Sequence, residues 1–361
     1  MRRWEFIDTL RGLAIVLMVF NHAGHYLAAL PHSIWSYSII YLTVTLAGPL
    51  FLFIAGFSAA LSIQKYSEIS GRDLFSKFLK RGLMLIGLGL LVNLFFYYDE
   101  PIWRGRILMT IGLSSILIYP FYYWAAGRFN RLILMAAALS GFFLFPLAYP
   151  FLAVAAGHQP VLAEIFWSEF PIYPWFFLML LGLLAGREFL ARAKLTKKSR
   201  QLIFGAGASL IFAWLALTLI YHGGSLFSFL NDYNLNGYWN PSPLTWLWIL
   251  GWIMLLFLFF YAWEDNLLRS NVRSTPSHST GQVLRSNWLA VMGRKALWLY
   301  FLQFFLIITL GRTLLRLRIT DLTVFILINL IIIYLLCLSA KYKRSAIDMA
   351  CGRLKPKARI S

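Results

Sequence analysis

Charged side chains are scarce in this 361-residue chain: they make up 13% of it, whereas hydrophobic residues make up 60%. A soluble globular domain carries roughly a quarter charged residues. Acidic residues are the scarcest, with 14 Asp and Glu against 33 Lys and Arg. So few polar groups cannot cover a water-facing surface of this size. The composition therefore excludes a soluble globular class and predicts a membrane protein.

Cysteine and histidine are scarce as well, with two and six residues respectively. Cys337 lies in the last apolar block and Cys351 in a basic C-terminal segment, so neither is placed to form an external disulfide. The spacing of Cys and His matches no metal-binding motif, and no nucleotide-binding loop is present. We therefore expect no metal site.

Apolar residues are abundant and occur in blocks long enough to cross a bilayer, which takes about 20 helical residues. The blocks cover residues 10–30, 37–63, 82–98, 106–125, 131–153, 171–190, 202–221, 244–263, 288–311 and 322–340. They predict an all-α polytopic membrane protein with about ten transmembrane helices. We expect one transmembrane domain over 1–345, a basic cytoplasmic tail over 346–361 and a flexible cytoplasmic loop from Asp265 to Asn287.

The distribution of basic residues predicts the orientation. With a cytoplasmic N-terminus, 28 of the 33 Lys and Arg residues fall on the cytoplasmic side, as the positive-inside rule requires. The residues left outside are Arg104, Arg106, Arg312, Arg316 and Arg318. We therefore predict an integral protein of a bacterial inner membrane with both termini cytoplasmic. The net charge of +19 is then a topology signal. No basic stripe on a soluble domain indicates a nucleic-acid partner.

The first apolar block contains polar residues that a membrane helix usually avoids. They recur at spacings of three and four, which places them on one helical face. The face consists of Asp8, Arg11, Ile15, Met18, His22, His25 and Ala29, and it is flanked by Asn21 and Tyr26. At about 1.5 Å per residue, His22 lies roughly 16 Å from Arg11, which predicts a position near mid-membrane.

Two interpretations of His22 are open. It either hydrogen-bonds a neighbouring helix and has no further role, or it takes part in chemistry inside the membrane. His22, His25 and His32 lie within eleven residues, and this clustering favours the chemical role. A neutral imidazole can take a proton from a hydroxyl or amine, or accept an acyl group itself. Asp8 is too distant to orient His22 and is expected to pair with Arg11.

A resemblance to known enzymes begins in the same stretch, Phe6–His22, whose sequence is FIDTLRGLAIVLMVFNH. It resembles the first span of membrane acyltransferases, namely the heparan-α-glucosaminide N-acetyltransferases with their bacterial relatives and the broad acyltransferase family three. The shared pattern is an Asp, an Arg-Gly, an apolar run and a His or Asn about eleven residues after the Arg. Weaker similarities to later spans of the family occur at residues 47–58, 80–83, 105–113 and 170–182.

The resemblance implies an acyl-CoA donor, most simply acetyl-CoA, at the cytoplasmic face and a sugar or glycan acceptor at the external face. The phosphates of the donor would be held by Arg11, Lys77, Lys80 and Arg81, although the positive-inside rule alone requires the same charges. The implied catalytic set is His22, Asp8 and Arg11, with His32 as the second candidate base. His32 is followed by Trp35, like the external histidine of the heparan-type enzymes.

The implied acceptor-binding residues are Asn21, His25 and Trp35. Trp35 and Trp239 either stack on a sugar or belong to the interfacial aromatic belt. Two other functions are considered besides acyl transfer. A transporter or flippase would explain polar residues at mid-membrane, but repeated halves and buried carboxylates are not evident in the sequence. A non-catalytic membrane component would explain the spans and leave the histidines unexplained. Homo-oligomerisation is left open.

Overall fold

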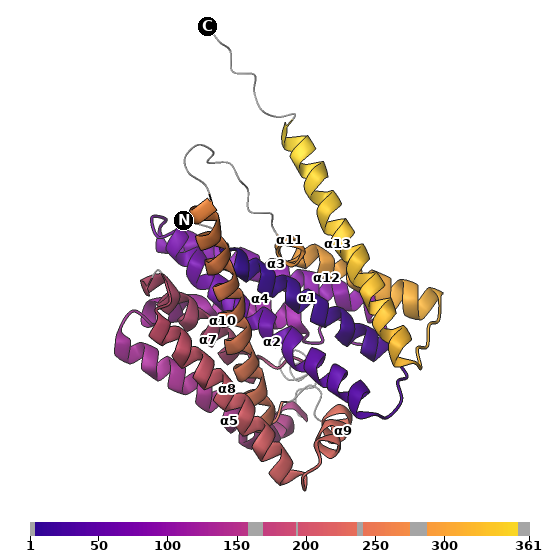
Figure 1. Cartoon of the computed structure of the whole chain (residues 1–361). Helices are drawn as coiled ribbons and strands as arrows, with labels where there is room; N and C mark the ends of the chain where they lie inside the picture. The colour runs from indigo at the N-terminus through magenta and orange to yellow at the C-terminus, as the bar shows by residue number, and fades with distance from the viewer. Residues whose placement is uncertain (1–3, 158–168, 193, 237–240, 275–286, 353–361) are drawn as a thin grey trace. The chain divides into compact units, whose positions relative to one another are not determined.

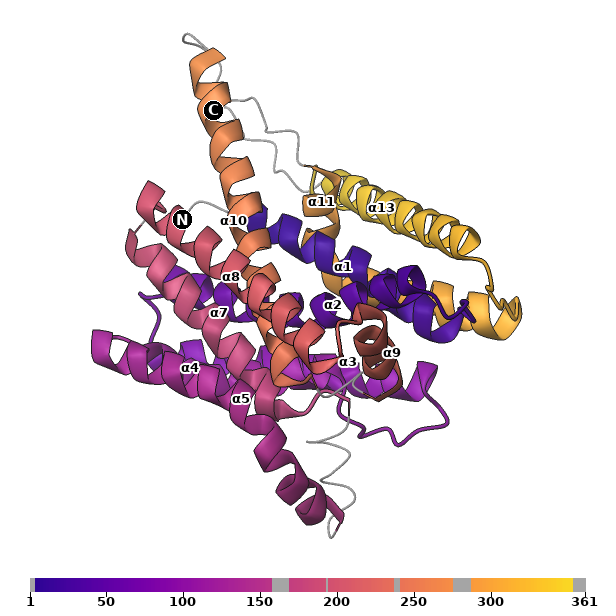
Figure 2. The same cartoon turned by 60° about the horizontal axis from the view of Figure 1, so that its bottom comes forward.

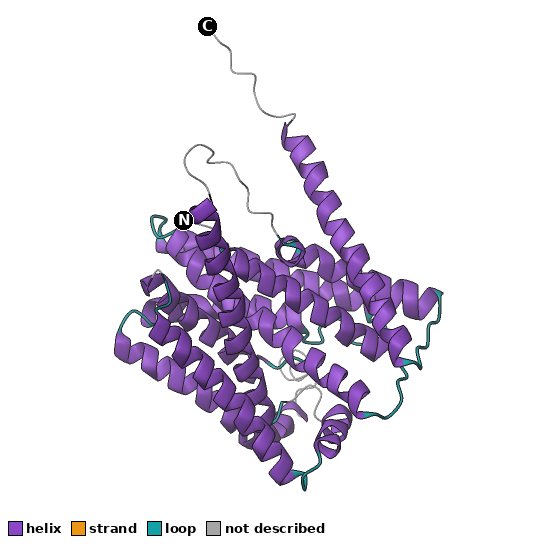
Figure 3. Ribbon diagram, in the orientation of Figure 1, coloured by secondary structure: helices purple, strands orange, loops and turns teal. Residues whose placement is uncertain are grey.

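The computed structural model describes residues 4–157, 169–192, 194–236, 241–274 and 287–352, and this part of the chain is helical throughout apart from short connections (Figure 3). Within it, ten helices are long and apolar enough to cross a membrane. The prediction of an all-α polytopic membrane protein is thereby confirmed. The helices are α1 Glu5–Tyr26, α2 Ile34–Lys65, α3 Gly71–Phe96, α4 Ile107–Trp124, α5 Arg128–Gly157, α7 Ile172–Arg192, α8 Lys197–Tyr221, α9 Leu226–Asn236, α10 Pro243–Ser274, α11 Trp288–Arg294, α12 Ala296–Phe304, the π-helix η1 Phe305–Leu314 and α13 Leu322–Gly352.

Three elements differ from the prediction. The block 288–311 is not one helix but the succession of α11, α12 and η1, with a break at Lys295. The short helix α9 was not predicted. The loop prediction from Asp265 is wrong up to Ser274, because α10 continues to that residue. Arg200 of α8 pairs with Asp265 at 2.6 Å and so stabilises the charged turn of α10. Residues 275–286 and Trp239 lie outside the described part.

The chain, coloured from N- to C-terminus in Figure 1, divides into two compact units. Unit 1 runs from His32 to Asn266 and contains α2 to α10. Unit 2 contains α1, on residues Trp4–Pro31, and the chain from Leu267 onward, with α11, α12, η1 and α13. The first helix is therefore grouped with the last ones. The predicted domain over 1–345 and tail over 346–361 stay predictions.

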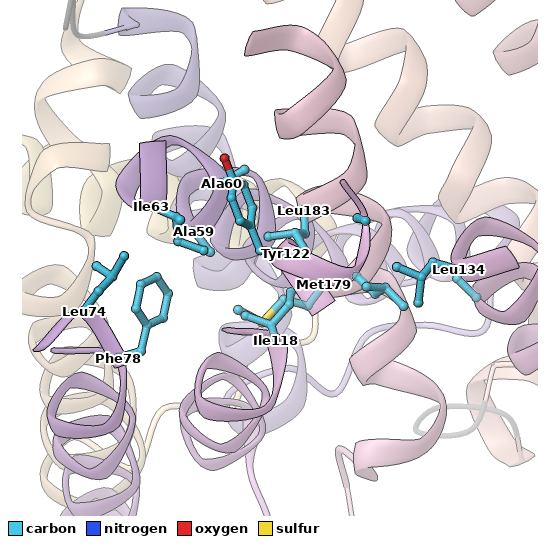
Figure 4. Packing of buried hydrophobic residues seen from close by; sticks show 13 residues of the cluster. Ala59, Ala60, Ile63, Leu74, Phe78, Ile118, Tyr122, Leu134, Met179 and Leu183 are labelled. Atoms are coloured by element: carbon cyan, nitrogen blue, oxygen red, sulfur yellow. The ribbon is translucent and has the colours of Figure 1, made fainter. Parts of the chain in front are cut away.

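Unit 1 is held together by close helix crossings. A Cβ at Gly56 of α2 would overlap the backbone carbonyl of Met179, and a Cβ at Gly182 of α7 would overlap that of Phe53. Small residues allow helix backbones in a membrane to approach this closely. Beside this crossing, α2, α3, α4, α5 and α7 share one apolar core, which includes Phe78 and is drawn in Figure 4. A second cluster joins α2, α8 and α9 around Tyr41, with Trp248 of α10 packed against it.

Unit 2 is organised around α1, which packs against α11, α12, η1 and α13 (Figure 2). Gly12 of α1 faces the backbone of Leu289, and Gly293 of α11 faces the backbone of Asp8, so neither position has room for a Cβ. Asn287 caps α11 through the backbone N–H of Ala290, at 2.7 Å. The Asn287 side-chain amide also donates a hydrogen bond to the Thr9 hydroxyl of α1, at 3.2 Å. These contacts fix the N-terminal half of α1.

Candidate functional site

The polar face of α1 begins at a buried ion pair. Asp8 is 2% exposed, and Arg11 donates a hydrogen bond to its carboxylate at 2.9 Å. The expected pairing of Asp8 with Arg11 is confirmed. Fourteen residues along α1 separate Asp8 from His22, about 21 Å at 1.5 Å per residue. Asp8 is therefore too far away to orient the His22 imidazole.

His22 lies one turn before the end of α1 at Tyr26, and its position near mid-membrane stays a prediction. The helix ends sooner than the predicted span because the chain after it is engaged elsewhere. The Leu27 carbonyl accepts a hydrogen bond from Ile319 N–H at 2.8 Å, and Ala29 N–H donates to the Ile319 carbonyl at 2.8 Å. Ala29 is consequently not part of the helical face. His22 itself is half-buried.

The His22 imidazole packs against α12. Its ring centroid lies 4.5 Å from that of Phe304, the last residue of α12. The neighbouring Gln303 is fully buried and its amide N–H donates to the Met18 sulfur at 2.8 Å. Met18 is one turn before His22 on the same face of α1. Gln303 and Phe304 therefore line the histidine face directly.

Aromatic and basic side chains surround the end of α1. The exposed His25 ring lies 4.6 Å from that of Tyr26, and the Arg312 guanidinium lies over the Tyr26 ring at 5.5 Å. Asn21 is half-buried beside His22. The predicted residues Asp8, Arg11, Asn21, His22 and His25 are thus all on α1 in unit 2.

The other predicted acceptor-side residues belong to unit 1. His32 is exposed and a ring nitrogen of it is hydrogen-bonded to the Tyr37 hydroxyl. Tyr37 is buried at the start of α2 and its ring lies 5.6 Å from that of Phe227 in α9. Trp35 is 71% exposed. His32 is therefore an exposed residue hydrogen-bonded to a tyrosine, whereas His22 is half-buried against α12.

The predicted donor-binding cations are not grouped in one unit. Arg11 is in unit 2 and engaged by Asp8, while Lys77, Lys80 and Arg81 are exposed on α3 in unit 1. Their spacing of three and four residues places them on one side of α3. Lys77 also lies over the Tyr66 ring at 4.2 Å. This arrangement is equally suited to an anionic membrane surface and to phosphates.

A charged cluster that sequence reasoning missed joins the connection before α4 to the residues before α7. Arg106 is 5% exposed and bonds both carboxylate oxygens of Glu169, at 2.6 and 2.7 Å. It also bonds Glu100, and Arg104 lies 3.1 Å from Glu100. Burial raises the pKa of the Glu169 carboxyl and outweighs the attraction of Arg106 and Arg104, which lowers it.

The model of the catalytic domain of heparan-alpha-glucosaminide N-acetyltransferase matches residues 3–221. The chain belongs to this family. It is therefore an integral membrane acetyltransferase, and acetyl-CoA is the donor that membership generally implies. No curated protein matches the chain. Within the described residues, no three His, Cys, Asp or Glu side chains gather as a metal site.

Glycines of the motifs seen in the sequence lie at helix crossings. Gly12 of the Arg-Gly pair contacts α11, Gly56 and Gly182 meet at the crossing of α2 with α7, and Gly82 and Gly112 meet between α3 and α4. These glycines are therefore packing positions. Gln303 and Phe304 lie beyond the matched segment and were missed. The signal available was a lone polar amide inside the apolar block 288–311.

Proposed function

We propose that this protein transfers an acetyl group from acetyl-CoA, taken up from the cytoplasmic face, to an amine or hydroxyl of a glucosaminide-type glycan at the external face. Membership of the acetyltransferase family supports the reaction class. The position of His22 carries the proposal, because this titratable side chain is packed against Phe304 one turn from the end of α1. With a cytoplasmic N-terminus, that end of α1 is the external one.

His22 acts as the general base in this proposal. The amine of the acceptor attacks the thioester carbonyl carbon, and the imidazole takes the proton that the amine loses. The carbon–sulfur bond then breaks, and the imidazolium returns the proton to the leaving thiolate. The products are the acetamide and coenzyme A. Alternatively the imidazole nitrogen accepts the acetyl group first and passes it to the acceptor.

His22 is preferred to His32 because of its surroundings. A half-buried imidazole against Phe304 is partly shielded from water, so that the thioester is less open to hydrolysis. His32 is exposed and hydrogen-bonded to Tyr37. It serves as the second candidate, with Trp35 beside it as a stacking surface for a sugar ring. Asn21 and His25 are the acceptor contacts on α1, and Lys77, Lys80 and Arg81 remain candidates for the donor phosphates.

The family match argues against the transporter or flippase function, because the matched domain is catalytic. Membranes containing the protein, given radiolabelled acetyl-CoA and 4-nitrophenyl α-D-glucosaminide, test the proposal. We expect label in the N-acetylated glucosaminide. Label that stays in acetyl-CoA with this amine and with simple sugar hydroxyls as acceptors would overturn the acceptor class. Movement of unmodified glucosaminide across the membrane would instead support transport.

A further inference from the structure

The strongest unexplained feature of unit 2 is the side chain of Gln303. It is completely buried inside a predicted membrane span. Its amide N–H is used by the Met18 sulfur, but its carbonyl oxygen Oε1 has no hydrogen-bond partner among the described residues. A buried carbonyl oxygen without a partner costs free energy, so such groups in native proteins usually have a function.

The backbone at this position is unusual too. Gln303 and Phe304 are the last residues of α12, and the chain continues as a π-helix of ten residues, Phe305–Leu314. π-Helical segments are rare and frequently mark functional sites. This one begins where α12 meets His22. Two independent observations, an unpaired buried oxygen and an irregular helix, therefore coincide on the histidine face of α1.

We propose that Gln303 is a substrate-contact residue whose carboxamide oxygen accepts a hydrogen bond from an amide N–H in the pantetheine arm of the acyl donor. The inference rests on the proposed function, whose donor it places. The Met18 sulfur that Gln303 contacts and the adjacent Phe304 are both apolar groups. One polar acceptor beside apolar groups fits a slender chain with isolated amide groups. A sugar, with a hydroxyl on most carbons, would need several polar partners.

The spacing along α1 agrees with this assignment. Met18 precedes His22 by one helical turn, toward the N-terminal end from which the donor enters. In coenzyme A, two methylene groups separate the sulfur from the nearest amide nitrogen. With the thioester carbonyl at His22, that nitrogen lies about one turn away, at the level of Met18 and Gln303. The same residues would hold the thioester against the imidazole.

The test compares two ligands on the purified full-length protein, coenzyme A and adenosine 3′,5′-bisphosphate, which lacks the pantetheine arm. Gln303→Met removes the oxygen and keeps the side-chain volume. We expect it to weaken coenzyme A binding about tenfold, as expected for losing a hydrogen bond to a buried group, and to leave the bisphosphate unchanged. Gln303→Glu, which keeps acceptor oxygens, should retain part of the preference for coenzyme A.

Asn329→Leu is the matched control. Asn329 of α13 is also fully buried with an unpartnered carbonyl oxygen, but its helix meets α1 at Phe20, through Phe325, away from the His22 face. It should leave both affinities unchanged. An unaltered ratio of the two affinities in Gln303→Met would overturn the inference, even in a partly destabilised variant. Failure of the wild type to bind coenzyme A would instead refute the proposed donor.

Discussion

His22 and His32 differ in surroundings, and their replacement separates two sites of chemistry. His22→Ala should lower acetyl transfer at least about 100-fold, the usual contribution of a general base, because the variant lacks the imidazole that takes the acceptor proton in the proposed mechanism. Expression and detergent stability should stay near those of the wild type, since the ring is only half-buried. The rate of steady-state acetyl transfer is measured for the purified His22→Ala and His32→Ala variants. An inactive His32→Ala with an active His22→Ala would place the reaction at His32, beside Tyr37, instead.

The raised pKa of the Glu169 carboxyl predicts how stability changes with pH. Burial raises the pKa of its carboxyl above the ordinary value of 4.5 despite Arg106 and Arg104, with Glu100 adding to the rise. The folded protein therefore binds more protons than the unfolded chain just above pH 4.5, so this carboxyl's contribution to the free energy of unfolding falls as pH rises through that window. The melting temperature of the wild type, taken relative to that of Glu169→Gln, should therefore fall from pH 5 to pH 7.

Glu68→Gln is a suitable comparison for that measurement, because Glu68 is exposed in the connection between α2 and α3. Its effect on the melting temperature should change less with pH than that of Glu169→Gln. A wild type that gains stability over Glu169→Gln with rising pH would show that ion pairing to Arg106 outweighs burial.

Glycines at helix crossings allow whole helices to pack closely. Gly12→Ala or Gly293→Ala would drive a methyl group into the backbone of the facing helix, and overpacking of this kind costs about 1–3 kcal/mol. We expect a lower melting temperature and, since α1 is displaced from α11, reduced transfer. Gly87→Ala is the control, because no atom lies within 4 Å of a Cβ there. An equal effect of all three substitutions would mean that these crossings are not tightly packed.

The sequence predicted the ten spans because apolar blocks of membrane length are an average property of many residues. It also predicted the shared face of α1 and the Asp8–Arg11 pair, which depend on helical spacing alone. The π-helix η1 and the packing of Gln303 on Met18 depend on which helices meet, and local spacing does not contain that information. The end of α1 at Tyr26 depends likewise on the distant Ile319.

On the scale of the molecule, the family match and the fold divide the chain differently. The matched segment, residues 3–221, contains α1 but ends before α11, α12 and η1, which pack on it in unit 2. The histidine face is therefore completed by the C-terminal part of the chain. His32 and Trp35 belong to unit 1. The residues proposed around His22, in unit 2, thus come from both ends of the sequence.

The ion pairs of unit 1 support the predicted topology. Arg131 pairs with Glu188 at 3.1 Å and Arg200 with Asp265 at 2.6 Å, and the prediction places all four on the cytoplasmic side. Arg106 pairs with Glu169 at 2.6 Å, and both are predicted to be external. Paired residues must share one side of a membrane, so the assignment of connections to sides is consistent within unit 1.

Which side is cytoplasmic stays a prediction from the excess of Lys and Arg. Reporter fusions after Lys65 and Arg200 should report the cytoplasm, and fusions near His158 and Asp232 the external side. Alkaline phosphatase, active only outside, and a green fluorescent protein, fluorescent only inside, give opposite signals at each position. Reversed signals at all four would invert the molecule and place His22 at the cytoplasmic end of α1. Acetyl-CoA would then reach the imidazole directly, without an arm extended past Gln303.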